Sequence, residues 1–242
     1  MQAIAVYSPK GGVGKTTLSV NLAWCAATLS ARRTLLWDLD PQGASTFLLG
    51  HDRALVGQAR AVFARDVSAD ALIVGTSVDR LDLLPADTSL RGLDLLLHGL
   101  GKRKRLNRLL ETLAGRYDRV ILDCPPGLTE TAEQVVRAAA LIIAPVIPSP
   151  LSRRAFDEMV LHLDRGGGRR PAMLPVFGMA DRRRSVHNAA LAADPDWPVI
   201  PMASVVEAMA TRRQPLGAFA PSSPPARAVA ELWTAIERRL AG

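Results

Sequence analysis

A glycine-rich stretch near the amino terminus, Pro9-Lys10-Gly11-Gly12-Val13-Gly14-Lys15-Thr16-Thr17, decides the fold. It follows a short apolar run, residues 3–7, and precedes a segment in which Leu18, Leu22 and Ala26 recur at helical spacing. A strand, a glycine loop and a helix in this order are typical of a phosphate-binding loop, because glycines let backbone N–H groups turn towards phosphate oxygens at a helix amino terminus. The stretch, which we call the phosphate loop, therefore predicts a nucleotide site.

The residue types of the phosphate loop have expected roles. Lys15 is expected to bridge the β- and γ-phosphates, and the Thr16 hydroxyl is expected to bind Mg²⁺. The remaining phosphate contacts are expected from the backbone around the glycines, at Gly11, Gly12, Val13, Gly14 and Thr17.

Short apolar runs separated by helical patterns continue along the chain, at residues 34–37, 81–84, 120–122, 141–146 and 174–177. Such runs indicate a parallel sheet that is buried on both faces. With 242 residues, we expect one α/β domain over residues 1–242, a three-layer P-loop NTPase fold with a mostly parallel central sheet flanked by helices. Residues 101–115 predict an amphipathic helix with a basic first turn, and residues 226–240 predict a final helix docked on the domain.

Two acidic motifs follow predicted strands. They are Asp38-Leu39-Asp40-Pro41-Gln42-Gly43, the first acidic loop, and Asp123-Cys124-Pro125-Pro126-Gly127, the second acidic loop. Sites in parallel sheets lie beyond the carboxyl ends of the strands, where both loops begin. Asp123 and Asp38 are therefore candidate metal-binding residues, and Asp40 is the candidate that orients or deprotonates an attacking water. The alternative is that these carboxylates form turns or cap helices.

The phosphate loop departs from the pattern G-x-x-x-x-G-K-[ST], because Pro9 replaces the first glycine and an additional lysine, Lys10, follows it. This resembles the deviant Walker A loop of the ParA/MinD family of P-loop ATPases, and the acidic loops look like the switch I and switch II motifs of that family. The resemblance implies ATP and Mg²⁺ as ligands, and Pro201 as part of the loop that encloses adenine. It also implies a homodimer in which Lys10 is catalytic, reaching across to the partner's phosphates.

Lys and Arg number 30 against 23 Asp and Glu, giving a formal net charge of +7. The excess indicates an acidic partner or only an arginine-rich composition. A ParA-type positioning ATPase would bind DNA without sequence preference and be released when a ParB-like or cargo-adaptor protein stimulates hydrolysis. The candidate DNA contacts are Arg182, Arg183, Arg184, Arg212 and Arg213, with further basic clusters at residues 102–105 and 169–170. This hypothesis places the protein in the cytoplasm, associated with the nucleoid.

Two alternatives remain open. A MinD-like membrane switch would need the final helix to seek a membrane, which Arg238 and Arg239 favour, whereas its apolar stripe favours docking and no stable membrane association. The second alternative is a metabolic ATP-dependent ligase or reductase with the same fold. The two cysteines, Cys25 and Cys124, have no metal-ligand spacing and support neither a disulfide framework nor a cluster site.

Overall fold

A computed structural model describes residues 1–242 except 52–57, 65, 101–103, 166–170 and 242. In the described part, eight strands form one sheet in the order β3-β4-β2-β5-β1-β6-β7-β8. The strands are β1 (Gln2–Val6), β2 (Thr34–Asp38), β3 (Val74–Gly75), β4 (Leu81–Leu84), β5 (Arg119–Asp123), β6 (Leu141–Val146), β7 (Ala172–Ala180) and β8 (Val199–Pro201). All neighbouring strands pair in parallel except β3 and β4. The predicted mostly parallel sheet is confirmed, and the edge strand β3 is an addition, because two residues are too few to form an apolar run.

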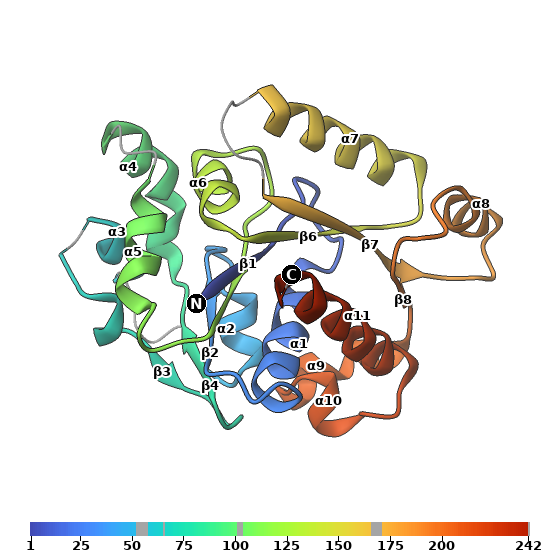
Figure 1. Ribbon diagram of the computed structural model, residues 1–242, viewed down its shortest axis with the longest axis horizontal. Helices are drawn as coiled ribbons and strands as arrows, with labels where there is room; N and C mark the ends of the chain where they lie inside the picture. Colours follow the sequence, from blue (N-terminus) through green and yellow to red (C-terminus); the bar gives the residue numbers. More distant parts are fainter. Residues whose placement is uncertain (52–57, 65, 101–103, 166–170, 242) are drawn as a thin grey trace.

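Both faces of the sheet are buried because successive side chains of each strand point to opposite sides. Ala3 and Ala5 of β1 belong to one apolar core, whereas Ile4 and Val6 belong to the other. The same alternation in the other central strands produces the continuous apolar runs seen in the sequence. Helices therefore cover both faces, which gives the three layers visible in Figure 1.

In the described part, one layer contains α3 (Ala59–Ala64), α4 (Leu93–Leu100), α5 (Arg105–Leu113), α6 (Glu130–Ala138) and α7 (Pro150–Arg165). Short 3-10 turns at Ala69–Ala71 and Thr88–Gly92 precede β3 and α4, respectively. The opposite layer contains α1 (Lys15–Thr28), α2 (Ala44–Leu48), α9 (Ala208–Arg212), α10 (Leu216–Phe219) and α11 (Pro224–Ala241). A further 3-10 turn, Ser204–Val206, precedes α9, and α8 (Ser185–Ala193) packs at the β8 end of the sheet (Figure 1).

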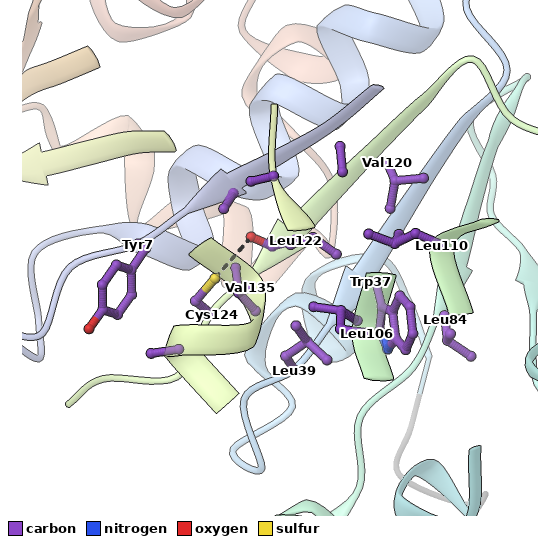
Figure 2. Packing of buried hydrophobic residues seen from close by; sticks show 14 of the residues in the cluster. Tyr7, Trp37, Leu39, Leu84, Leu106, Leu110, Val120, Leu122, Cys124 and Val135 are labelled. Carbon is purple, nitrogen blue, oxygen red and sulfur yellow. Dashed lines mark hydrogen bonds between the residues drawn. The ribbon is translucent and has the colours of Figure 1, made fainter. Parts of the chain in front are cut away.

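The predicted amphipathic helix is α5, and its apolar face packs on the sheet. Leu106 and Leu110 point towards β2 and β5, where Trp37 and Val120 lie (Figure 2). The expected basic first turn is wrong at Arg105, which is 3% exposed and donates from Nε to the carbonyl oxygen of Phe63 at 2.6 Å. An arginine can be buried in this way because its long stem is aliphatic and its head can reach a backbone acceptor. Residues 102 and 103 lie outside the described part.

The final helix, α11, packs against α1 in the second layer. Its apolar stripe, Val229, Leu232, Trp233 and Ile236, is buried in the core. Two polar contacts fix the helix further: Trp233 donates from Nε1 to Ser30 Oγ at 2.8 Å, and Glu237 accepts from Arg119 at 2.7 Å. Among the described helices, none has an apolar stretch long enough to cross a membrane.

The order of strands positions the site. β5 lies between β2 and β1, so the carboxyl ends of these three strands are adjacent. The phosphate loop leaves β1, the first acidic loop begins at the end of β2, and the second acidic loop begins at the end of β5. Three segments that are far apart in the sequence therefore meet at one edge of the sheet.

Candidate functional site

The phosphate loop turns through two glycines with left-handed backbone and ends at α1. Gly12 has φ 70° and Gly14, which precedes the first residue of α1, has φ 87°. Side chains rarely adopt this region, so glycine is required at both turns. No side chain caps the start of α1, which leaves its first backbone N–H groups for a ligand at the loop.

Lys15 is the first residue of α1, and its side chain folds back into the phosphate loop. It is 7% exposed, and its Nζ donates to the carbonyl oxygen of Lys10 at 3.0 Å. Burial lowers the pKa of its ammonium, while the nearby carboxylates of Asp123 and Asp40 act in the opposite direction. A buried cation inside a ring of glycine N–H groups is suited to a polyphosphate.

The two buried aspartates, Asp38 and Asp123, are direct neighbours across the parallel pair of β2 and β5. Neither side chain has measurable exposure. Asp38 Oδ2 accepts from the backbone N–H of Thr46 at 2.9 Å and from its hydroxyl at 2.8 Å. Asp123 accepts from the hydroxyls of Ser19 at 3.0 Å and Ser45 at 2.6 Å. The Asp123 carboxylate therefore accepts from two hydroxyls, and the Asp38 carboxylate from one hydroxyl and two backbone N–H groups.

Burial raises the pKa of both aspartates, and their mutual repulsion adds to this for Asp38. The nearby Thr16 hydroxyl acts to lower the pKa of Asp123, so the expected metal-binding hydroxyl lies close to the expected metal-binding carboxylate. Two adjacent carboxylates and a hydroxyl are oxygen ligands of the kind Mg²⁺ takes, usually one or two carboxylates with substrate phosphates. A divalent cation also offsets the repulsion, so the residues fit Mg²⁺.

Asp40 lies in the first acidic loop, half-buried, beyond the aspartate pair. Its backbone N–H donates to Asp38 Oδ1 at 3.2 Å, and its Oδ1 accepts from the backbone N–H of Gln42 at 2.9 Å. These bonds fix the carboxylate at the mouth of the site, where its charge acts on Lys15. The role of Asp40 in orienting or deprotonating a water stays a prediction.

The second acidic loop is bonded directly to the phosphate loop. The backbone N–H of Gly127 donates to the carbonyl oxygen of Pro9 at 2.9 Å, and Tyr7 donates from its hydroxyl to the carbonyl oxygen of Gly127 at 2.8 Å. Gly127 adopts φ 96°, so glycine is needed there as well. The position of the phosphate loop is thereby coupled to the loop that follows Asp123.

Lys10 points away from the interior of the loop that Lys15 occupies. Its Nζ donates at 3.0 Å to Ser152 Oγ in the first turn of α7. The two lysines of the motif thus have different surroundings within one chain, Lys15 inside the loop and Lys10 at its outer side.

A cavity of 150 Å³ adjoins the phosphate loop. Val13, Gly14 and Thr17 line it from the loop, and Ile200 and Pro201 line it from β8. Met179, whose backbone is left-handed with φ 54°, lines it from β7 and lies close over Gly14. The lining is largely apolar, as an adenine pocket requires. The structure therefore brings Pro201 to the phosphate loop.

The candidate DNA contacts lie in two separate environments. Arg182, Arg183 and Arg184 are exposed at the start of α8, and Arg183 forms an ion pair with Asp181 at 2.9 Å. Arg212 lies over the ring of Phe219 and Arg213 over the ring of Phe47. The cluster at residues 169–170 lies outside the described part of the chain.

Sequence reasoning missed the residues that support the site. Ser19, Ser45, Thr46 and Ser152 hydrogen-bond to the predicted site residues, but isolated hydroxyls have no motif. Ser19 carries a weak signal, because it lies four residues after Lys15 and shares its helix face. Ser152 had none, since only the fold brings α7 to Lys10.

Both cysteines are buried in the apolar cores. Burial raises the pKa of the Cys25 thiol to about 12 and that of Cys124 above its usual value. Cys124 directs its Sγ to the carbonyl oxygen of Leu122 (Figure 2). Neither thiol has the lowered pKa or the exposure of a nucleophile.

Comparison with known proteins gives matches over most of the chain. A family model described as "AAA domain" matches residues 1–165. The Soj sporulation initiation inhibitor protein of Bacillus subtilis is 39% identical over 145 residues, 59% of this chain and 57% of Soj. The chromosome partitioning protein ParA of Caulobacter vibrioides is 31% identical over 197 residues, 77% of this chain and 72% of ParA.

A solved structure has a similar fold over nearly the whole chain. A protein of Mycobacterium smegmatis described as cobyrinic acid a,c-diamide synthase, with a bound ATP analogue and magnesium, has a TM-score of 0.83 and 30% identity. The match covers 99% of this chain and 95% of that one. Together with the phosphate loop, the buried aspartates and the sheet order, these matches show that the chain belongs to the ParA/MinD family of P-loop ATPases.

Proposed function

We propose that the chain is an ATP-dependent dimerising ATPase that segregates DNA or positions an intracellular cargo. The observation that carries the proposal is the arrangement of its two lysines: Lys15 occupies the interior of the phosphate loop, and Lys10 lies outside it at α7. The phosphate site already contains Lys15. A second lysine at its outer side is therefore placed to contact a nucleotide that another chain binds. There it would neutralise charge on the transferring phosphoryl group.

The surface around Lys10 supports a homodimer. Leu128 in the segment after the second acidic loop is 49% exposed, and Leu151 at the start of α7 is 73% exposed. Both lie on segments that leave the carboxyl edge of the sheet, near the phosphate loop. Exposed large apolar residues beside a charged site favour burial against a partner. A dimer formed at this edge would bring Lys10 of each chain towards the other nucleotide.

The residues of one chain have distinct parts in hydrolysis. Lys15 and the N–H groups of the phosphate loop bind and orient the phosphates. Thr16, Asp38 and Asp123 would hold Mg²⁺, which when bound neutralises phosphate charge and orients the γ-phosphate. Asp40 orients or deprotonates the attacking water from its position at the mouth of the site. Closure of a dimer over this mouth would exclude bulk water and add Lys10.

Nonspecific DNA binding is the expected action of the dimer. Arg182 and Arg184 are exposed at the start of α8, and a dimer would present both pairs with twice the net charge of +7. Contacts to phosphates give affinity without sequence preference and a steep dependence on salt. We expect the ATP-bound dimer to associate with the nucleoid and a ParB-like or cargo-adaptor protein to release it by stimulating hydrolysis.

Light scattering during size exclusion tests the dimer. The wild type should elute as a monomer with ADP and as a dimer with a non-hydrolysable ATP analogue. Lys10→Ala should stay monomeric with the analogue although it still binds it. A wild type that remains monomeric at micromolar concentration with the analogue would reject the switch.

A second candidate is a metabolic ligase, which the description of the Mycobacterium smegmatis protein favours. Amide formation through a thioester intermediate needs a nucleophilic thiolate, and both cysteines of this chain are buried with raised pKa values. The two functions separate in one assay. A ligase would turn over ATP in proportion to its carboxylic acid substrate, whereas a positioning ATPase would respond to DNA and a partner protein.

A further inference from the structure

Arg213 has surroundings that differ from those of a DNA contact. It follows the last residue of α9 and adopts φ 52°, the left-handed region that side chains rarely occupy. A residue other than glycine is strained in this conformation, and contacts of its side chain offset the strain.

The side chain of Arg213 reaches the end of α2. Its Nε donates to the carbonyl oxygen of Phe47 at 3.2 Å, and its Nη2 donates to the carbonyl oxygen of His51 at 3.5 Å. Its Cζ lies 4.4 Å from the centre of the Phe47 ring. The Phe47 carbonyl also accepts from the backbone N–H of Gly50 at 3.0 Å, and the rigid guanidinium adds a side-chain donor to it while it reaches His51, three residues beyond α2. Arg213 therefore fastens the end of α2.

Helix α2 in turn carries donors for both buried aspartates. Ser45 donates to Asp123 at 2.6 Å, and Thr46 donates to Asp38 from its hydroxyl and its backbone N–H. Ser45 and Thr46 directly precede Phe47, whose carbonyl Arg213 binds. Any shift of α2 would therefore change the orientation of the two carboxylates.

The segment before Arg213 reaches the cavity beside the phosphate loop. Val206 and Glu207, directly before α9, line that cavity, and Met209 of α9 contacts the Asn21 side chain on α1. Arg213 thus joins the segment beside this cavity to the helix that holds the carboxylates.

We propose that Arg213 is a positioning residue for the magnesium half of the site, fixing α2 so that Ser45 and Thr46 hold Asp123 and Asp38 in place. The inference rests on the proposed function only in taking the ligand to be a nucleotide with Mg²⁺.

The test measures how much Mg²⁺ strengthens the binding of fluorescent ADP, as the ratio of affinities in Mg²⁺ and in EDTA. Arg213→Gly removes the side chain and fits the left-handed backbone without strain, so the fold should be retained. The Mg²⁺ enhancement should fall by roughly 2- to 30-fold, the range for residues that act through a network. Affinity in EDTA should change little. Arg213→Lys, which keeps the charge and one donor, should recover part of the enhancement.

Arg212→Ala is the matched control. It removes the same charge from the adjacent position, but Arg212 packs on Phe219, 5.1 Å from the ring centre, and not on the Phe47 ring of α2. Its Mg²⁺ enhancement should equal that of the wild type. Thermal unfolding of each variant distinguishes a specific loss of Mg²⁺ enhancement from a general loss of stability. A general loss of stability would weaken ADP binding equally in Mg²⁺ and in EDTA.

Three results would overturn the inference: an unchanged enhancement in Arg213→Gly, a wild-type ADP affinity that does not depend on Mg²⁺, or loss of DNA affinity with the enhancement intact. The last would make Arg213 a DNA contact. A chain that neither dimerises nor binds DNA, but loses Mg²⁺ enhancement in Arg213→Gly, would reject the proposed function and retain the role of Arg213.

Discussion

The Nζ atom of Lys10 lies 3.0 Å from the Oγ atom of Ser152, within one chain. Lys10 comes from the phosphate loop and Ser152 from the first turn of α7, so the bond joins two segments at the expected dimer face. In the proposed dimer, a Lys10 side chain that turns towards the partner's phosphates would leave Ser152. We therefore expect this bond to oppose dimerisation of the free chain.

Ser152→Ala should strengthen the ATP-dependent dimer. A hydrogen bond to a charged group contributes roughly 1.5 kcal/mol and the dimer contains two such bonds, so the dimer dissociation constant should fall by up to about 100-fold. Sedimentation equilibrium with a non-hydrolysable ATP analogue measures this. A weaker dimer would mean that Ser152 holds Lys10 in the assembled state instead.

Asp40→Ala should separate binding from turnover. The Asp40 carboxylate lies at the mouth of the site and not among the hydroxyls around the aspartate pair, so ATP and Mg²⁺ should still bind and the dimer should form. Hydrolysis should fall by roughly 100-fold or more, the usual contribution of a general base. Phosphate release is the measurement, and normal turnover would move the role to another residue.

The stability of the chain without Mg²⁺ should fall as the pH rises. Burial raises the pKa of Asp38 and Asp123 above that of the unfolded chain, so the folded chain binds more protons than the unfolded chain at intermediate pH. Their contribution is complete below the ordinary carboxyl pKa and is lost as the pH rises through the raised values. Melting temperatures in EDTA, from about pH 4 to about pH 8, measure it. Asp38→Asn should flatten the profile, and a stability that rises over this interval in the wild type but not in Asp38→Asn would contradict the sign.

Replacing Arg182 and Arg184 together with alanine should weaken DNA binding by the ATP-bound dimer. The salt slope should fall by about one for each DNA phosphate that the variant no longer binds. ATP turnover without DNA should not change. The control is the pair Arg32→Ala and Arg116→Ala, which removes the same charge from the exposed ion pairs with Glu237 and Asp70. Equal losses of affinity in the two double variants would mean that only net charge matters.

Gly217→Ala should destabilise the fold, because a Cβ there would lie 2.2 Å from the Trp24 ring. Overpacking of this kind costs about 1–3 kcal/mol. Gly115→Ala is the control, since a Cβ at Gly115 meets nothing within 4 Å. Urea unfolding of the two variants measures the difference, and equal midpoints would show that α10 moves away from α1 at little cost.

The sequence by itself determined the fold class and the main residues of the site. The phosphate loop requires specific residues in consecutive positions, and buried parallel strands require continuous apolar runs, so both are visible in local sequence. The strands that end at Asp38 and Asp123 predicted two carboxylates at one edge, and the pairing of β2 with β5 confirms that they are neighbours.

Only the tertiary structure decided which residues support that site. Ser152 meets Lys10 across 142 positions of sequence, and Arg213 meets Phe47 across 166. Arg105 was expected in a basic turn and is buried instead, because its long aliphatic stem can be buried while its head reaches a backbone acceptor. A hydroxyl or a guanidinium has no fixed partner in sequence, since its hydrogen bonds depend on which backbone or carboxylate the packed helices bring within about 3.5 Å.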